Sequence, residues 1–118
     1  MTSTASFDEL TWHDGRILDI HIGFDPSGAC EIKLKVSLLE SLSTQDRIHY
    51  LIVATNPERF FSNMDIYLMV QHFKFGNIAD AKLYHNESKK LLIYLGEGYL
   101  EIIGHNIEIS GKMGTPYN

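Results

Sequence analysis

The chain is poor in the residues that mark several classes of protein. It has one cysteine, Cys30, and three prolines among 118 residues, and its apolar runs are short, as in "LLIYL" from Leu91 to Leu95. A disulfide needs two cysteines, and a membrane-spanning helix needs about 20 consecutive apolar residues. The composition therefore excludes an intramolecular disulfide and predicts that the chain has no membrane-spanning helix. We expect Cys30 to act as a small buried apolar residue.

Targeting signals and basic charge are also scarce. The N-terminal stretch "MTSTASFDEL" has no basic segment followed by an apolar one, so a secretory signal is not indicated and a cytoplasmic location is expected. There are 10 Lys and Arg residues against 15 Asp and Glu, which gives a formal net charge of −5. Because phosphate neutralisation requires clustered basic side chains, a nucleic acid is not an expected partner, and neither is a membrane.

The remaining composition is that of an ordinary globular protein. Hydrophobic residues make up 44% of the chain and charged residues 21%. The length suits one hydrophobic core, and no repeat or Gly/Ser/Pro linker divides it. We therefore expect one domain over residues 1–118, with an ordered core at about 7–110.

The stretch "DIHIGFDPSGACEIKLKV" (19–36) predicts a β-hairpin. Pro26, Ser27 and Gly28 fit a three-residue loop in which Gly28 takes the left-handed conformation. Asp25 then lies opposite Ala29. One face pairs Phe24 with Cys30, Ile22 with Ile32, Ile20 with Leu34 and Leu18 with Val36, and we expect this face to be core. The other face pairs Gly23 with Glu31, His21 with Lys33, Asp19 with Lys35 and Ile17 with Ser37, and a solvated face is favoured there over a site.

Further elements follow along the chain. Residues 47–54 ("RIHYLIVA") predict a third strand, which "NPERFF" ends. The segment "SNMDIYLMVQHFKFG" predicts a short helix with Ser62 or Asn63 as N-cap and Gly76 just past its end, although its β-branched and aromatic content leaves a strand as the alternative. "NIADAKLYH" and "KLLIYLGEGYLEIIGHNIEIS" predict the remaining strands. The expected fold is an antiparallel sheet of about six strands with one short helix, in the α+β or mainly β class.

The "GEG" sequence predicts a hairpin turn with two possible registers. Either Glu97 and Gly98 form a two-residue loop, or Gly98 is the left-handed residue of a longer one. Both faces of the flanking strands are largely apolar, so we expect them at the centre of the sheet, covered by the helix or by a second chain. With the aromatic residues of "ERFFSN" and "HFKFG", this apolar surface predicts a homodimer. The alternative is a monomeric sandwich in which one set of strands covers the other.

Recognised catalytic and ligand-binding motifs are missing. The six histidines include no H-x-x-x-H spacing on the expected helix, and there is no C-x-x-C, so no metal site is expected. A P-loop, a dinucleotide fingerprint and G-x-S-x-G are also missing, so we expect no cofactor. A catalytic triad can form from residues distant in sequence, so enzymatic activity is disfavoured rather than excluded.

The segment "WHDGRILDI" is the most distinctive part of the chain. Trp12 and His13 precede the expected first strand, and Asp14 with Gly15 marks a turn or bulge. The favoured interpretation is structural: Trp12 closes the edge of the core, and Asp14 bonds local backbone amides. The alternative is that Trp12, His13 and Asp14 form an interaction site or pocket.

Three segments taken in order, "WHDGRILDI", "GNIADAKL" and "LLIYLGEGYLEI", resemble a group of small uncharacterised bacterial domains. Their layout is similar to that of some immunity proteins of polymorphic toxin systems, which open with a comparable "HD" strand. The resemblance spans about Phe7 to Ile109, and its motifs are structural, so no functional residue is carried over. It implies a bacterial, cytoplasmic, mostly β protein that works by binding another protein.

Together these observations predict a non-enzymatic protein-interaction module. Its specific form is an immunity or antitoxin-like protein whose acidic surface covers a basic toxin. The alternative is a small-molecule-binding domain or minor enzyme with a pocket near Trp12, His13 and Asp14.

Overall fold

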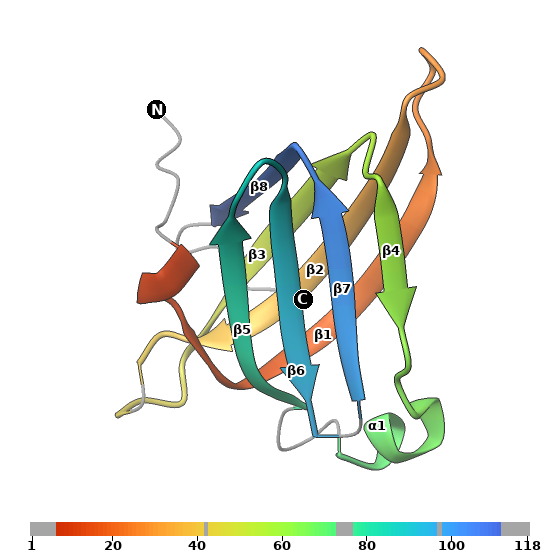
Figure 1. The fold of residues 1–118 in the computed structure, drawn as a ribbon. Helices are drawn as coiled ribbons and strands as arrows, with labels where there is room; N and C mark the ends of the chain where they lie inside the picture. The colour runs from red at the N-terminus through yellow and green to blue at the C-terminus, as the bar shows by residue number, and fades with distance from the viewer. Residues whose placement is uncertain (1–6, 42, 73–76, 97, 112–118) are drawn as a thin grey trace.

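The computed structural model describes residues 7–41, 43–72, 77–96 and 98–111, and within them the protein is mainly β (Figure 1). A short 3-10 turn, η1 (Phe7–Glu9), precedes eight antiparallel strands and one short helix, α1 (Ile66–His72). No helix among these residues is long and apolar enough to cross a membrane. The strands are β1 (Thr11–Phe24), β2 (Cys30–Leu39), β3 (Arg47–Thr55), β4 (Arg59–Ser62), β5 (Ile78–His85), β6 (Lys89–Leu95), β7 (Gly98–Gly104) and β8 (Asn106–Gly111).

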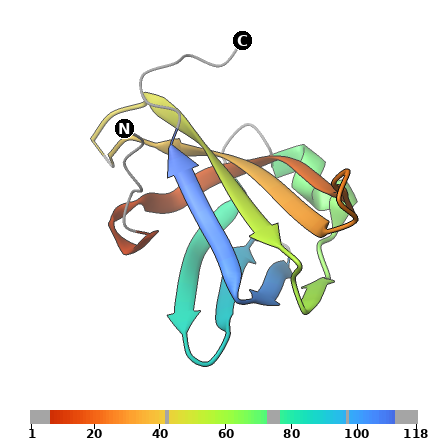
Figure 2. The same cartoon turned by 90° about the horizontal axis from the view of Figure 1, so that it is seen from above.

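The sheet is folded over on itself. Its strand order is β4, β7, β6, β5, β1, β2, β3, β8, and the central junction between β5 and β1 consists of one residue pair, Ile78 with Gly15. Strands β1, β2, β3 and β8 (the β1 half) cross behind β4, β5, β6 and β7 (the β6 half), as Figures 1 and 2 show. The core between the two halves includes Leu34, Ile52 and Ile109 from the first and Leu91, Ile93 and Ile102 from the second. Each half therefore covers the apolar face of the other.

The sheet has eight strands where the sequence predicts about six. The first additional strand, β4, lies within the segment expected only to break the sheet, and it pairs with β7 from Arg59 opposite Ile103 to Ser62 opposite Leu100. The second arises because the last expected strand divides at His105 into β7 and β8. β7 belongs to the β6 half and β8 to the β1 half, so the chain must change direction between them.

The first hairpin has the predicted loop. The Asp25 amide donates to the Ala29 carbonyl at 2.9 Å, and Gly28 has a φ of 92°. The Asp25 carboxylate accepts hydrogen bonds from the Ser27 hydroxyl at 2.6 Å and from the Ala29 amide at 3.0 Å, and these lower the pKa of Asp25. The predicted pairing is confirmed from Phe24 opposite Cys30 as far as Asp19 opposite Lys35.

The predicted register is wrong beyond Asp19 because β1 contains a bulge at Leu18. Ile17, not Leu18, lies opposite Val36, and Arg16 lies opposite Ser37. The extra residue reverses the faces, so Ile17 is buried where the sequence places it on the polar face.

The expected core face is also wrong at the hairpin tip. Ile22 is 52% exposed and Phe24 77% exposed, whereas Leu34 is fully buried on the same face. The tip extends past the β6 half, as Figure 1 shows, so nothing within the described part of the chain covers it. Cys30, which faces Phe24, is only half-buried.

The helix forms where predicted, but its N-cap lies two or three residues later and the helix covers neither half. Its N-cap is Asp65, whose carboxylate accepts a hydrogen bond from the Leu68 amide at 3.1 Å. The expected caps have other roles: Ser62 ends β4, and Asn63 binds β7. Ile66, Tyr67 and Val70 are exposed. The expected packing of the helix on the sheet is therefore wrong, because the β1 half occupies the inner face of β6 and β7. Phe73 and Gly76 lie outside the described residues.

The β6–β7 hairpin has neither of the two predicted registers. Leu95 lies opposite Gly98, so Gly98 begins β7 and is not part of the loop. Glu97 lies outside the described residues. Gly98 has a φ of 135°, and a Cβ there would lie 2.8 Å from the Asn63 carbonyl oxygen. Both constraints require glycine at the strand end rather than in the loop. Tyr94 consequently lies opposite Tyr99.

Candidate interaction surface

Trp12 belongs to the core rather than to a pocket. Its side chain is 4% exposed, and its indole Nε1 donates a hydrogen bond to the Phe7 carbonyl at 3.0 Å. The Phe7 and Trp12 rings lie 4.6 Å apart between centroids. These contacts fit the structural interpretation, in which Trp12 closes the edge of the core.

His13 and Asp14 lie next to Trp12 but point to solvent. The His13 Nε2 is 3.6 Å from the Asp14 carboxylate, and its Nδ1 is 3.4 Å from the Ala79 carbonyl. Asp14 has a φ of 64° and sits in a bulge within β1, not before it. The backbone carbonyl of Asp14 accepts a hydrogen bond from Arg47 at 3.0 Å. Because the indole is buried, only the two polar side chains are accessible to a ligand.

A basic group of side chains lies on the outer face of the β1 half beside Asp14. Arg47 donates hydrogen bonds to the carbonyls of Ser37 and Asp14, and burial, followed by the charge of Arg16, lowers its pKa. Burial is also the main cause of the lowered pKa of His49, to which the charges of Lys35 and Arg47 add. The hydrogen bonds of Arg47 join β3 to β2 and β1, so we assign it a structural role.

The structure also brings a serine, a carboxylate and a histidine together at one end of the β6 half. The Ser88 hydroxyl donates to Glu58 Oε2 at 2.9 Å, and His105 Nε2 lies 3.4 Å from the same oxygen. In a catalytic triad the histidine bonds the nucleophile and the acid orients the histidine. Here the carboxylate stands between the other two, so the imidazole is not placed to take the serine proton. The exposed cluster instead connects the β3–β4, β5–β6 and β7–β8 turns.

Among the described residues, no group of three or more His, Cys, Asp and Glu side chains is arranged to hold a metal ion.

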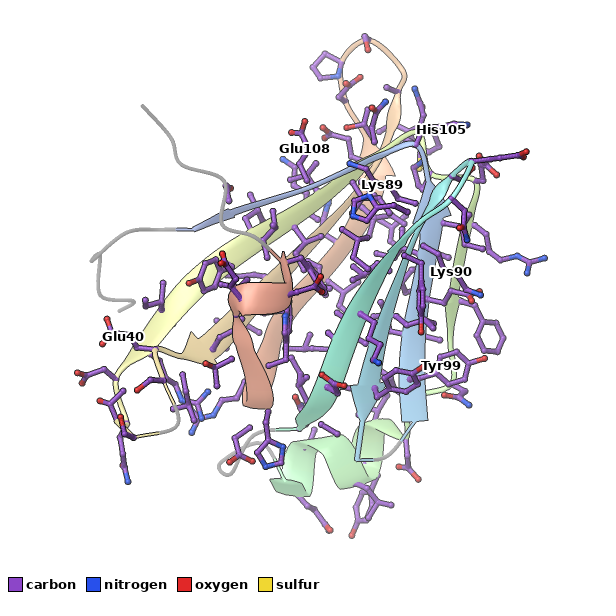
Figure 3. The ribbon with its side chains drawn as sticks, turned by 60° about the vertical axis from the view of Figure 1, so that its left-hand side comes forward. Glu40, Lys89, Lys90, Tyr99, His105 and Glu108 are labelled. Carbon is purple, nitrogen blue, oxygen red and sulfur yellow. The ribbon has the colours of Figure 1, made fainter. Side chains whose placement is uncertain are left out.

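A broad apolar surface lies on the outer face of the β6 half. Leu91, Ile93, Leu100 and Ile102 point into the core, so the residues that alternate with them point outward. Figure 3 shows two of these outward residues, Lys90 and Tyr99, on the side away from the β1 half. We call this surface the aromatic face; it comprises Arg59, Phe61, Asp80, Lys82, Tyr84, Lys90, Leu92, Tyr94, Tyr99, Glu101 and Ile103.

Aromatic rings dominate this surface. Phe61 is 45% exposed, Tyr84 40% and Tyr94 39%. Tyr94 and Tyr99 are directly opposite each other on β6 and β7, and the Phe61 and Tyr99 ring centroids are 5.6 Å apart on β4 and β7. The rings of Phe61, Tyr99 and Tyr94 thus span three adjacent strands, β4, β7 and β6. A pleated sheet holds them in fixed positions, so they can contact a partner with little loss of conformational entropy.

Charged groups surround the rings. Lys90 Nζ is 3.5 Å from Glu101 Oε2, which pairs two of the charges on neighbouring strands. Arg59 and Lys82 lie on the outer strands, β4 and β5. This distribution, with aromatic groups at the centre and polar groups around them, is the usual anatomy of a protein–protein interface.

The sequence predicted surplus apolar surface on these strands, but it did not identify which face is exposed because the register of the β6–β7 hairpin was open. The alternation Ile93, Tyr94, Leu95 shows a tyrosine between two apolar residues, and the same holds for Tyr99 before Leu100. Only the pairing of Leu95 with Gly98 places the two tyrosines side by side. Phe61 belongs to "ERFFSN", whose aromatic residues were expected to add apolar surface, but its position beside Tyr99 was not predicted because the segment was interpreted as a break in the sheet.

No protein-family model, curated protein or solved structure matches this chain.

Proposed function

We propose that this chain is a non-enzymatic protein-interaction module and that the aromatic face is its binding surface. The observation that carries the proposal is the row of Phe61, Tyr99 and Tyr94 on three adjacent strands of the sheet, in which Phe61 and Tyr94 are exposed and Tyr99 is half-buried between them. Exposed apolar patches with polar margins commonly mark protein-binding sites, and tyrosine is enriched among the residues that contribute most to binding.

The partner in this proposal is a separate polypeptide. A flat sheet face offers area rather than a concave pocket, and small-molecule sites are usually concave. The resemblance to immunity proteins supports one specific form, in which the partner is a toxin produced by the same organism. The net charge of −5 would favour its association with a basic protein.

A capture experiment with matched variants tests the binding surface. Tyr94→Lys changes the centre of the aromatic face, and Tyr67→Lys introduces the same substitution on the exposed surface of α1. A genuine partner should be retained from a lysate of the source organism by the wild type and by Tyr67→Lys, and lost with Tyr94→Lys. Equal capture by all three proteins would refute the assignment.

The immunity form has its own test. Polypeptides encoded next to this chain are expressed alone in a sensitive host, and then together with the wild type or with Tyr94→Lys. We expect one of them to arrest growth, the wild type to restore growth, and Tyr94→Lys to restore it poorly. If none of the neighbouring products is toxic, the immunity form is wrong, whereas the capture experiment still tests the binding surface.

A further inference from the structure

One edge of β1 has no paired strand among the described residues. β5 meets β1 at the single pair Ile78 and Gly15, whereas β2 accompanies β1 as far as Phe24. Within the described residues, the part of β1 from Asp19 to Phe24 therefore has a paired strand on one side only. This part is not the end of a short strand, because β1 as a whole is 14 residues long.

The backbone groups on this free edge can be assigned from the hairpin loop. The Asp25 amide donates to the Ala29 carbonyl, and in an antiparallel ladder the bonded pairs then recur at every second residue. Gly23 and His21 thus direct their backbone groups toward β2, and Ile20, Ile22 and Phe24 direct theirs toward the free edge. The hydrogen bonds of β2 are consistent with this assignment. Cys30 lies opposite Phe24, and its carbonyl accepts a hydrogen bond from the Asn56 amide at 2.7 Å on the side of β3, away from β1.

Two of the usual protections of an edge strand, proline and lysine, are missing here. Edge strands are commonly blocked by proline, by lysine or by very short length. The stretch from Asp19 to Phe24 reads "DIHIGF", with neither proline nor lysine. Ile22 and Phe24 add two exposed apolar side chains beside the free backbone groups. Such an edge is a template for another strand.

We propose that this edge pairs with the same edge of a second copy, forming a homodimer whose two-fold axis passes through His21. In this antiparallel arrangement Ile20 lies opposite the partner's Ile22, and Ile22 lies opposite the partner's Ile20. Both residues direct their backbone groups to the free edge, so each pair exchanges two hydrogen bonds. The interface is isologous, as a closed two-fold dimer requires.

Charge complementarity favours this register. The His21 imidazole leans over Gly23, since a Cβ built on Gly23 would lie 2.9 Å from His21 Cε1. The register centred on His21 places Gly23 opposite the partner's Asp19, so each imidazole comes beside a carboxylate of the other copy. Centring the axis on Ile22 would instead place Asp19 opposite the partner's Asp25, two like charges. Centring it on Ile20 would place the bulge at Leu18 opposite the partner's Ile22, two residues from the axis, whereas the register centred on His21 reaches the bulge only at its last pair, Phe24 with the partner's Leu18.

This dimer uses a different surface from the aromatic face, and neither proposal depends on the other. Tyr94→Lys should therefore dimerise like the wild type, which keeps failure of the proposed function distinct from failure of the dimer.

Sedimentation equilibrium over a micromolar concentration range tests the dimer. We expect the wild type to reach twice its 13.5 kDa chain mass. Ile22→Pro removes an amide that points to the free edge and leaves the ladder with β2 intact, so it should raise the dissociation constant at least about tenfold. Ile22→Thr is the matched control. It also shortens the apolar side chain but keeps the amide, so it should still be dimeric at the upper end of the concentration range. A monomeric wild type, or an Ile22→Pro variant that associates as strongly as Ile22→Thr, would overturn the proposal.

Charge variants test the register. They also distinguish loss of the dimer contact from misfolding, because two correctly folded monomeric variants should associate when they are mixed. Asp19→Lys places a lysine beside the partner's His21, and His21→Glu places a glutamate beside the partner's Asp19. Each variant alone should be largely monomeric, whereas an equimolar mixture should form a heterodimer because the lysine of one chain then faces the glutamate of the other. A mixture that stays monomeric would show that this register is wrong.

Discussion

Asn77 and Ile17 join the two halves of the sheet through one side-chain hydrogen bond. The Asn77 Oδ1 accepts from the Ile17 amide at 3.2 Å, although 60 residues separate them in sequence. The backbone of Asn77 adds two more links, donating to the Gly15 carbonyl at 2.9 Å and accepting from the Gly96 amide at 3.1 Å. Asn77 is buried at the point where β1 passes from one half to the other, so it holds that junction together.

Asn77→Ala should lower the free energy of unfolding by about 1–3 kcal/mol, because it leaves the Ile17 amide buried without an acceptor. Urea denaturation followed by Trp12 fluorescence measures the change. Asn86→Ala, in the exposed β5–β6 turn, is the control and should change stability by less than about 0.5 kcal/mol. Similar values for the two variants would contradict the role assigned to Asn77.

Gly15→Ala should destabilise the protein by about 1–3 kcal/mol through overpacking. An added Cβ would lie 2.6 Å from Leu38 Cδ2 and 3.0 Å from the Trp12 carbonyl oxygen, and the backbone oxygen has little room to move. At Gly96 no atom lies within 4 Å of the same added Cβ, so Gly96→Ala serves as control. Chemical denaturation of both variants tests the difference; a Gly15→Ala protein as stable as Gly96→Ala would show that the junction can relax.

Two residues of the predicted core face should respond very differently to truncation. Leu34→Ala removes a fully buried side chain and should cost about 2–5 kcal/mol. Phe24→Ala removes a ring that is 77% exposed at the hairpin tip, so the stability of the monomer should change by less than about 0.5 kcal/mol. Thermal and urea unfolding at low protein concentration provide the comparison. A large loss for Phe24→Ala would mean that the tip is covered in the folded monomer.

Stability should fall as the pH drops below about 6.5, partly through His49. Burial, followed by the charges of Lys35 and Arg47, lowers the pKa of His49 from its ordinary value of 6.5. The unfolded state therefore binds the proton more readily than the folded state, and acidification through this range favours unfolding. His49→Gln should reduce the loss of stability between about pH 7.5 and about pH 5.5. His85→Gln, an exposed control on β5, should retain the wild-type dependence, and an identical dependence in all three proteins would exclude His49 as the cause.

The sequence predicted the local structure of the first hairpin well. Pro26, Ser27 and Gly28 each suit one position of a three-residue loop, and the loop fixes the pairing of neighbouring residues as far as Asp19. This information is local, since backbone conformational preferences and the period of two along a strand do not depend on the rest of the fold. The register fails at Leu18, where a bulge accommodates the passage of β1 between the two halves.

The candidate surface could be predicted only in part. Both faces of β6 and β7 carry apolar residues, and this was visible in the sequence. The sequence did not show which face would be covered, because this depended on the hairpin register and on the element that packs against the two strands. The helix was expected to cover one face, but the β1 half covers it instead. Two strands were missed: β4, which extends the β6 half, was interpreted as a break, and β8, which extends the β1 half, was not separated from β7.

By itself, the sequence determined the β-rich class, the antiparallel hairpins and the alternation of inward and outward side chains, because these follow from residue preferences over a few positions. Only the tertiary structure decided which apolar residues are core. Ile22 and Leu34 lie on one predicted face, yet the first is exposed and the second is buried. The difference arises because burial requires a covering layer, and the β6 half, formed by residues distant in sequence, reaches Leu34 but ends before the hairpin tip.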